Sequence, residues 1–172
     1  IDEGLVGSEM CIRDRWTIAK KLLQHERKFI SNFGLAAAMG SKKDVVSLAK
    51  KHFGEDEGKI SNPIFRSKVI DHKMKEHAFG LTLQRAADEG GKASAVASMF
   101  KYYGTEHNKK RHELMIAASG VNGLAWDGNE FDDSEKNLTK AWLRTKGNSI
   151  EGGTSEVQLN VISKRVLELP SG

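Results

Sequence analysis

The sequence predicts an all-α protein, an up-down helical bundle formed by a single domain, and three observations lead to this prediction. Only 2 of the 172 residues are proline, and segments rich in Ala, Lys, Leu and Glu favour long helices over short strands and turns. Apolar residues recur at three-and-four spacing in three long segments and in shorter ones. Glycine, asparagine and proline mark the loops between these segments, and none of the segments alternates like a strand.

Residues 1–15 are expected to lie outside the fold as a non-native or disordered segment. The stretch LVGSEMCIRDR, residues 5–15, shows no periodicity leading into the patterned segment that begins at Trp16. It resembles the translation of a sequencing adapter, and an ordinary linker is the alternative interpretation. The domain is therefore expected to span residues 16–170.

The first predicted helix runs from Trp16 to about Met39, and Gly40 and Ser41 mark its end. A second, short helix covers residues 44–52. The next stretch, GEDEGKISNP at residues 54–63, combines glycine, charge and proline, so we expect an exposed loop there.

Two long helices are predicted in the middle of the chain. The first begins after Pro63, ends near Gly90, and carries an apolar face formed by Ile70, Met74, Ala78 and Leu81. The second covers residues 92–119 and ends at Gly120. Its last turns present the apolar residues Leu114, Met115 and Ala118.

Two further helices are predicted after the loop GVNGLAWDGNEFDD at residues 120–133. The shorter one covers residues 134–146 and carries Leu138, Trp142 and Leu143. The last helix presents Leu159, Ile162, Val166 and Leu169 along one face.

The composition excludes several classes of protein. A formal charge of +4 is mild and its basic residues are spread along the chain, which argues against a nucleic-acid interface. A single cysteine fits a reducing compartment, and no apolar stretch is long enough to span a membrane, so we expect a cytoplasmic, bacterial protein. The six histidines form no pair at four-residue spacing, so no metal site is expected.

Glu26 is the most unusual charged residue in the first helix. Its neighbours at three and four positions are all apolar: Leu22, Leu23, Phe29 and Ile30. Burial would raise the pKa of its carboxyl group, as a general base requires. The alternative is an ion pair with another helix, or a position at the wet edge of the apolar face.

The stretch NSIEGGTSEVQLNVI, residues 148–162, suggests a second site. Gly152 and Gly153 allow close approach of backbone to a ligand, and Ser155 with Gln158 fits a capping box at a helix start. Unpaired N–H groups there could bind an anion or a polarised carbonyl oxygen. Capping alone is the alternative reading.

Three blocks of sequence resemble the C-terminal helical domain of flavin-dependent acyl-CoA dehydrogenases. They are WTIAKKLLQHER, ELMIAASGVNGL and NSIEGGTSEVQLNVISKRVLELP, at residues 16–27, 113–124 and 148–170. The resemblance implies a fragment, the final third of a parent chain that uses FAD to convert an acyl-CoA thioester to a trans-2-enoyl-CoA. It also implies an electron-transfer flavoprotein as acceptor, a homodimer or homotetramer, and an isolated fragment that is inactive.

The resemblance also implies roles for individual residues. Catalytic glutamates of the family precede either an arginine in the first helix or the Gly-Thr of the last block, so Glu26, followed by Arg27, is the expected base and Glu151 the alternative. The backbone N–H of Gly152 is expected to hold the thioester carbonyl, with Arg27 and Gly153 adjacent to the substrate. The residues expected at the flavin are Thr154, Ser155, Glu156 and Gly120.

One departure from the family pattern and one rival hypothesis accompany this resemblance. The family's Arg-x-x-Phe-Gly motif, which reaches the flavin of the partner subunit, is not recognisable, and Arg66 is a weak candidate to replace it. Apolar surfaces made for missing domains are expected to cause self-association. The rival hypothesis is a non-catalytic helical module for binding or assembly.

Overall fold

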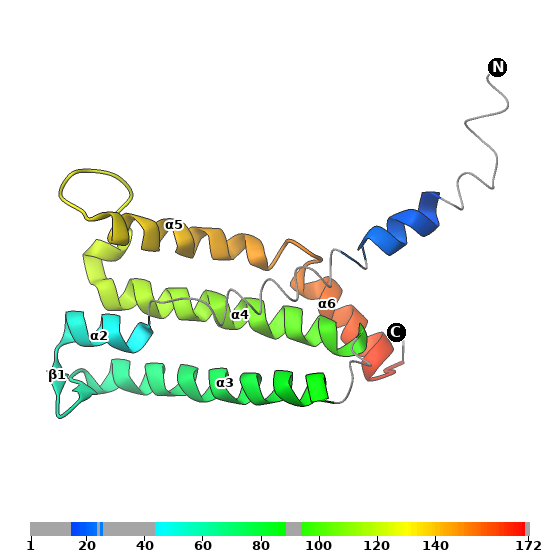
Figure 1. The fold of residues 1–172 in the computed structure, drawn as a ribbon, viewed down its shortest axis with the longest axis horizontal. Helices are drawn as coiled ribbons and strands as arrows, with labels where there is room; N and C mark the ends of the chain where they lie inside the picture. Colours follow the sequence, from blue (N-terminus) through cyan, green and yellow to red (C-terminus); the bar gives the residue numbers. More distant parts are fainter. Residues whose placement is uncertain (1–14, 24, 26–43, 89–93, 171–172) are drawn as a thin grey trace, which may run out of the picture.

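The computed structural model describes residues 15–23, 25, 44–88 and 94–170. Residues 15–23 are helical, which agrees with the start of the first predicted helix. Two helices of 26 residues dominate the rest: α3, Pro63–Asp88, and α4, Ser94–Ser119. They run in opposite directions, as the up-down prediction requires (Figure 1).

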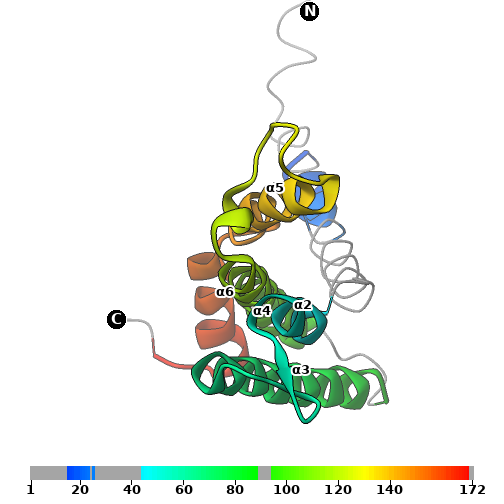
Figure 2. The ribbon, with the colours of Figure 1, turned by 90° about the vertical axis from the view of Figure 1, so that its left-hand side faces the viewer.

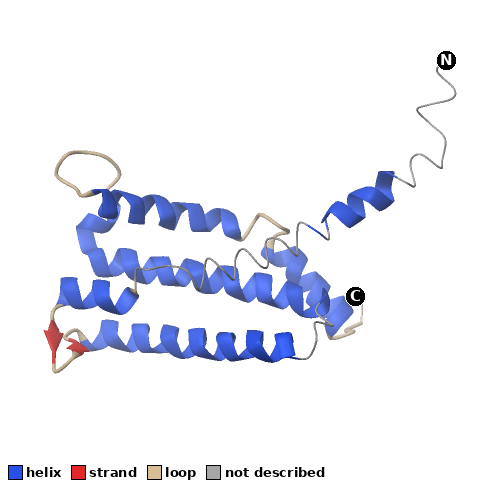
Figure 3. Cartoon of the chain, in the orientation of Figure 1, coloured by secondary structure: helices blue, strands red, loops and turns tan. Residues whose placement is uncertain are grey.

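The central element of the bundle is α4. It packs against α2 (Val45–Phe53), α3, α5 (Asp133–Asn148) and α6 (Ser155–Val161). Figure 2 looks nearly along α4 and shows these helices placed around it. The all-α prediction is confirmed for the described residues, in which helices account for most of the chain (Figure 3).

The loop predicted at residues 54–63 is largely exposed, as expected, and it contains a small hairpin that was not predicted. Strands β1, Glu55–Asp56, and β2, Lys59–Ile60, pair antiparallel with Glu55 opposite Ile60. Glu57 and Gly58 connect them, both with positive φ, as the tightest hairpin turns require. Two-residue strands are too short to leave an alternating pattern in the sequence.

Side chains fix the junction between the hairpin and α3. The Oδ1 atom of Asn62 accepts a hydrogen bond from the backbone N–H of Phe65 at 2.9 Å, which satisfies a free donor in the first turn of the helix. Arg66 donates from Nη1 to the carbonyl oxygen of Ile60 at 3.0 Å. The guanidinium group of Arg66 therefore holds β2 against α3.

The apolar core lies where α2, β2, α3, α4 and α5 meet. Burial of Leu114, Met115, Ala118 and Leu138 agrees with the apolar faces predicted for α4 and α5. A buried Leu or Met side chain contributes roughly 1.5–3 kcal/mol when it leaves water, and the alanine methyl group contributes less. The remaining buried core residues are Val45, Ala49, Ile60, Phe65 and Val69.

The apolar face predicted for α3 points to solvent rather than to the core. Ile70, Met74 and Leu81 are 51%, 68% and 54% exposed. The helix is buried instead through Phe65, Val69 and His72, a second set at helical spacing. Periodicity shows which residues share a face, but it does not tell which face meets a neighbouring helix.

The C-terminal helix is shorter than its apolar repeat predicts. α6 ends at Val161 and continues as the π-helical turn η2, Ile162–Val166. Leu159, Val166 and Leu169 are exposed, so their predicted common face is not buried in this chain. No helix in the described part of the chain is both long and apolar enough to cross a membrane.

The connection between α4 and α5 begins with a short 3-10 helix, η1, at Gly120–Leu124. α4 ends at Ser119, as predicted from Gly120. A capping box opens α5, because Asp132 accepts from the N–H of Glu135 and the Glu135 side chain accepts from the N–H of Asp132. Thr139 then donates to the carbonyl oxygen of Gly123 at 3.0 Å and joins η1 to α5.

Candidate functional site

The glycine turn, defined as residues 149–154, connects α5 to α6 and contains the two glycines singled out in the sequence. Gly152 has a φ of 66° and Gly153 a φ of 95°, values that residues with a Cβ rarely adopt. A Cβ on Gly153 would lie 2.8 Å from Nε2 of Gln158. Both glycines are therefore required by the path of the chain.

The helix start beside this turn differs by one residue from the prediction. Thr154, and not Ser155, is the N-cap of α6, and its hydroxyl oxygen accepts from the N–H of Val157. Gln158 does not complete a capping box. It is almost completely buried and donates from Nε2 to the carbonyl oxygen of Gly152 at 2.9 Å.

Lys101 of α4 supports the other glycine. Its Nζ atom donates to the carbonyl oxygen of Gly153 at 2.7 Å, and the lysine is only 6% exposed. Burial lowers the pKa of Lys101, although the nearby carboxylates of Glu151, Glu106 and Glu156 partly oppose that shift.

Sequence reasoning missed Lys101, yet a signal for it exists. Four small residues occupy the positions three and four away from it on the helix, and they leave room for a lysine to lie flat: Ala97, Ser98, Gly104 and Thr105.

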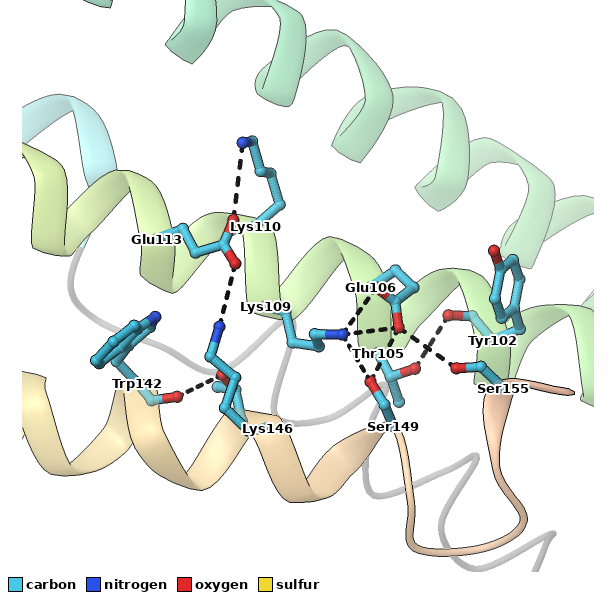
Figure 4. Close-up of polar contacts among 11 residues, drawn as sticks. Tyr102, Thr105, Glu106, Lys109, Lys110, Glu113, Trp142, Lys146, Ser149 and Ser155 are labelled. Carbon is cyan, nitrogen blue, oxygen red and sulfur yellow. Dashed lines mark hydrogen bonds and ion pairs between the residues drawn. The ribbon is translucent and has the colours of Figure 1, made fainter.

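Glu106 ties the glycine turn to α4 through a polar cluster (Figure 4). Lys109 donates to its carboxylate at 3.0 Å, the Ser149 hydroxyl at 2.9 Å and the Ser155 hydroxyl at 3.4 Å. Burial alone would raise the pKa of Glu106, but the hydrogen bonds from Lys109 and Ser149 outweigh it and hold the pKa below its usual value. An ionised Glu106 therefore anchors both ends of the turn.

Glu151, the alternative catalytic base, is engaged in an ion pair. Arg144 donates to its Oε2 at 2.7 Å and Asn148 to its Oε1 at 2.5 Å. The hydrogen bond from Arg144 is the main reason that the pKa of Glu151 is lowered. A lowered pKa makes a carboxylate a weaker proton acceptor, which is the opposite of what a general base needs.

The expected base, Glu26, and its neighbour Arg27 lie outside the described residues. Their position relative to the glycine turn therefore stays a prediction.

The backbone N–H of Gly152 has no acceptor among the described residues. Beside it, Ile150 and Val157 present exposed apolar side chains. A free donor next to apolar surface fits an acyl thioester, whose carbonyl oxygen needs a donor and whose chain needs apolar contact. Thr154 and exposed Glu156 extend this surface along the start of α6.

Gly120 is remote from the glycine turn. It lies at the C-terminal end of α4, 19 residues beyond Lys101, which corresponds to roughly 28 Å along the helix. Its φ is 57°, and no heavy atom lies within 4 Å of the place where a Cβ would be. The backbone is thus open to close approach, but not by a ligand group that also contacts Gly152.

Two open grooves of the described residues lie elsewhere. One, of about 500 Å³, is formed by α2, the hairpin and α3, and the other, of about 520 Å³, by α3. Neither is lined by a residue of the glycine turn. The described residues thus present an anchored donor on an open surface, which resembles one wall of a binding site.

Comparison with known proteins identifies relatives over most of the chain. The family described as "Acyl-CoA dehydrogenase, C-terminal domain" matches residues 15–167. The acyl-CoA dehydrogenase IpdE1 of Mycobacterium tuberculosis is 25% identical over 158 residues, and IpdE1 of Mycolicibacterium smegmatis is 24% identical over 159. Each alignment covers 91% of this chain but only 39% and 37% of the relatives.

Solved structures share the fold. A structure described as the Tcur3481-Tcur3483 steroid ACAD G363A variant superposes with a TM-score of 0.66 at 20% identity, over 91% of this chain and 40% of that one. The ChsE4-ChsE5 complex from Mycobacterium tuberculosis gives a TM-score of 0.61 at 18% identity, over 74% and 34%. At these identities the likeness supports the fold alone.

Proposed function

The chain belongs to the acyl-CoA dehydrogenase family and matches its C-terminal domain; from that premise, we propose that it is the C-terminal part of a flavin-dependent enzyme that introduces a trans double bond between Cα and Cβ of an acyl-CoA thioester. The observation that carries the proposal is the free N–H of Gly152 in a turn anchored from both sides by Lys101 and Gln158.

The proposed role of the glycine turn is to polarise the substrate. Hydrogen bonding from the Gly152 N–H to the thioester carbonyl stabilises the negative charge that develops on its oxygen when the α-proton leaves. Lys101 and Gln158 restrain the carbonyl groups of Gly153 and Gly152, so the donor is positioned before the substrate arrives. The nearby positive charge of Lys101 adds to this stabilisation.

Glu26 is the proposed general base for the α-proton, and Arg27 and Gly153 lie next to the substrate in this proposal. The pairing of Glu151 with Arg144 supports this choice over the alternative base. FAD, when bound, accepts the β-hydrogen as hydride. Thr154, Ser155 and Glu156 are the proposed contacts to that flavin, and Gly120, at the far end of α4, is the proposed contact to the flavin of a neighbouring subunit.

The proposal assigns turnover to a longer protein. The chain spans about two fifths of the length of the curated relatives it matches. We therefore expect the isolated chain to be inactive, and the complete protein to form a homodimer or homotetramer and to pass electrons to an electron-transfer flavoprotein. Both structural neighbours are named for two proteins, ChsE4-ChsE5 and Tcur3481-Tcur3483, so an assembly with a second, different subunit is a variant of this proposal.

A second candidate function is a non-catalytic helical module for assembly. The exposed apolar side chains of α3 favour it, because Ile70, Met74 and Leu81 form a surface suited to a protein partner. In that case the glycine turn would serve only to join α5 and α6.

The two functions are separated by flavin reduction in the complete protein. The experiment recovers the full gene, purifies its product with flavin, and mixes it with a panel of straight-chain, branched and steroid-bearing acyl-CoA thioesters. We expect loss of flavin bleaching in Glu26→Gln and retention in Glu151→Gln. Loss only in Glu151→Gln would overturn the choice of base, and a wild-type protein that binds no flavin would favour the assembly module.

A further inference from the structure

A cluster of three potential metal ligands lies between α3 and α4, away from the glycine turn. His72 and Glu76 are four residues apart and therefore share one face of α3. His107 faces them from α4, and one ligand atom from each residue lies within 4.8 Å of the other two. No metal site was expected, because the sequence has no pair of histidines four residues apart. This cluster instead combines residues from two helices and includes a glutamate, and the spacing of histidines along one helix cannot reveal such an arrangement.

Both ring nitrogens of His72 and one of His107 are buried without the hydrogen bonds that such groups normally make. His72 is only 2% exposed, and neither of its ring nitrogens has a partner among the described residues. Nε2 of His107 is also buried without a hydrogen-bond partner among the described residues. The rings stack with centroids 4.0 Å apart and planes 10° apart, which gives packing but satisfies no nitrogen. Unpaired buried nitrogens are costly, and a bound ion is one of the few groups that would satisfy them.

We propose that His72, Glu76 and His107 form a binding site for a divalent transition-metal ion, best suited to Zn²⁺. Two imidazoles and one carboxylate are a common ligand set for zinc, with water at the remaining position. Zinc bonds of about 2.0–2.2 Å at a tetrahedral angle place ligand atoms roughly 3.4 Å apart. The spacing of at most 4.8 Å must close, and because imidazole lone pairs lie in the ring plane, one of the two stacked rings must also turn out of its parallel arrangement to face the ion.

The charges around the cluster both help and oppose the ion. Burial lowers the pKa of His72 to about 4 and also lowers that of His107, so both rings are neutral at neutral pH and offer lone pairs. Lys73 pairs with Glu76 at 2.9 Å but also with Asp44 at 3.1 Å, so it retains a partner when Glu76 turns to the ion. Buried Arg111 and exposed Lys75 oppose a further positive charge, so we expect moderate rather than very tight binding.

The ion has a path to the cluster. Glu76 lines the open groove of about 520 Å³ on α3, together with Lys73, His77, Gly80, Leu81 and Gln84. Once bound, the ion would join α3 to α4 through ligands on both helices and stabilise the folded chain over the unfolded one.

The test is zinc uptake by the purified 172-residue chain, with ZnCl₂ as the only added ligand. Equilibrium dialysis followed by elemental analysis should give one bound Zn²⁺ per chain, a ratio that self-association does not alter. Thermal unfolding should shift upward by roughly 5 °C at zinc well above its Kd. Co²⁺ in place of zinc should show the visible absorption of a tetrahedral site.

Matched variants decide whether this cluster is the site. Glu76→Gln and His107→Phe, which keeps a ring stacked on His72, should lose the bound ion. His77→Ala and Asp71→Asn remove an exposed histidine and an exposed carboxylate from the same helix and should retain it. Zinc uptake that survives both ligand variants, or no uptake by the wild-type chain, would overturn the proposal. If circular dichroism shows that His107→Phe is unfolded, Glu76→Gln alone decides.

Discussion

Lys101 donates a hydrogen bond from Nζ to the carbonyl oxygen of Gly153 at 2.7 Å, across 52 residues of sequence. Together with the cluster around Glu106, this contact joins the central helix to the turn on which the proposed chemistry depends. The lysine is buried and its pKa is lowered by burial, so its ammonium group remains there at a cost. The first prediction tests what that contact does for the turn.

Lys101→Met should loosen the glycine turn without unfolding α4. The methionine fills most of the space, but the carbonyl oxygen of Gly153 loses its donor, which costs about 1.4 kcal/mol locally. Hydrogen exchange at the amide of Ser155, which donates across the turn to the carbonyl oxygen of Ser149 at 3.2 Å, should accelerate roughly tenfold. Lys110→Met on an exposed part of the same helix is the control and should leave exchange in the turn unchanged. Equal protection in the two variants would show that Lys101 does not hold the turn.

Glu106→Gln should make the free energy of unfolding less dependent on pH in the acid range. The pKa of Glu106 is lower in the folded state, so its contribution is fully present above the unfolded pKa near 4.5 and is lost as pH falls through the folded value. Urea unfolding between about pH 6 and pH 3 should therefore fall less steeply in the variant than in the wild type. Asp133→Asn removes an exposed carboxylate as the control. Parallel curves for Glu106→Gln and wild type would contradict the prediction.

Two glycine-to-alanine changes should have opposite signs. Gly153→Ala requires a side chain at a φ of 95° and places Cβ 2.8 Å from the buried Gln158 amide, so it should destabilise by roughly 1–3 kcal/mol. Gly80→Ala, in the interior of α3 with no atom within 4 Å, should stabilise by roughly 0.5–1 kcal/mol. Chemical denaturation measures both. If Gly153→Ala left the free energy of unfolding unchanged, the turn would have to possess a second backbone conformation that accepts a side chain at this position.

The exposed apolar face of α3 should drive self-association of the isolated chain. Met74→Glu with Leu81→Glu places charge within that face and should shift light-scattering mass toward the monomer. Gln84→Glu with Lys75→Glu alters charge on the same helix without removing apolar surface, and it should leave the association unchanged. A monodisperse wild-type monomer at high concentration would contradict the prediction.

Much of the fold could be predicted from residue spacing. Helices at residues 45–53, 63–88, 94–119 and 133–148 were predicted within a few residues of their observed ends, because periodicity and glycine boundaries are local signals. The buried side of α3 could not be predicted, since both of its faces carry apolar residues. Which one meets α4 depends on the rest of the bundle.

Only the backbone conformation of the candidate site could be predicted from the sequence. The two glycines indicated a turn with unusual φ values, and Gly152 and Gly153 have them. Glu106 and Lys101 are ordinary charged residues of a polar helix in the sequence. Their importance arises from contacts with residues about 50 positions away, which no local pattern contains.

The hairpin at residues 55–60 offers an attachment point for a reporter group. Its turn residue Glu57 is exposed and already has a positive φ, and the only paired backbone beside it is the two-residue ladder. The chain has one cysteine, Cys11. Glu57→Cys combined with Cys11→Ser therefore gives a unique thiol for a fluorophore, next to Gly58 and Lys59 at the edge of the groove between α2 and α3, where its emission would report any molecule that enters.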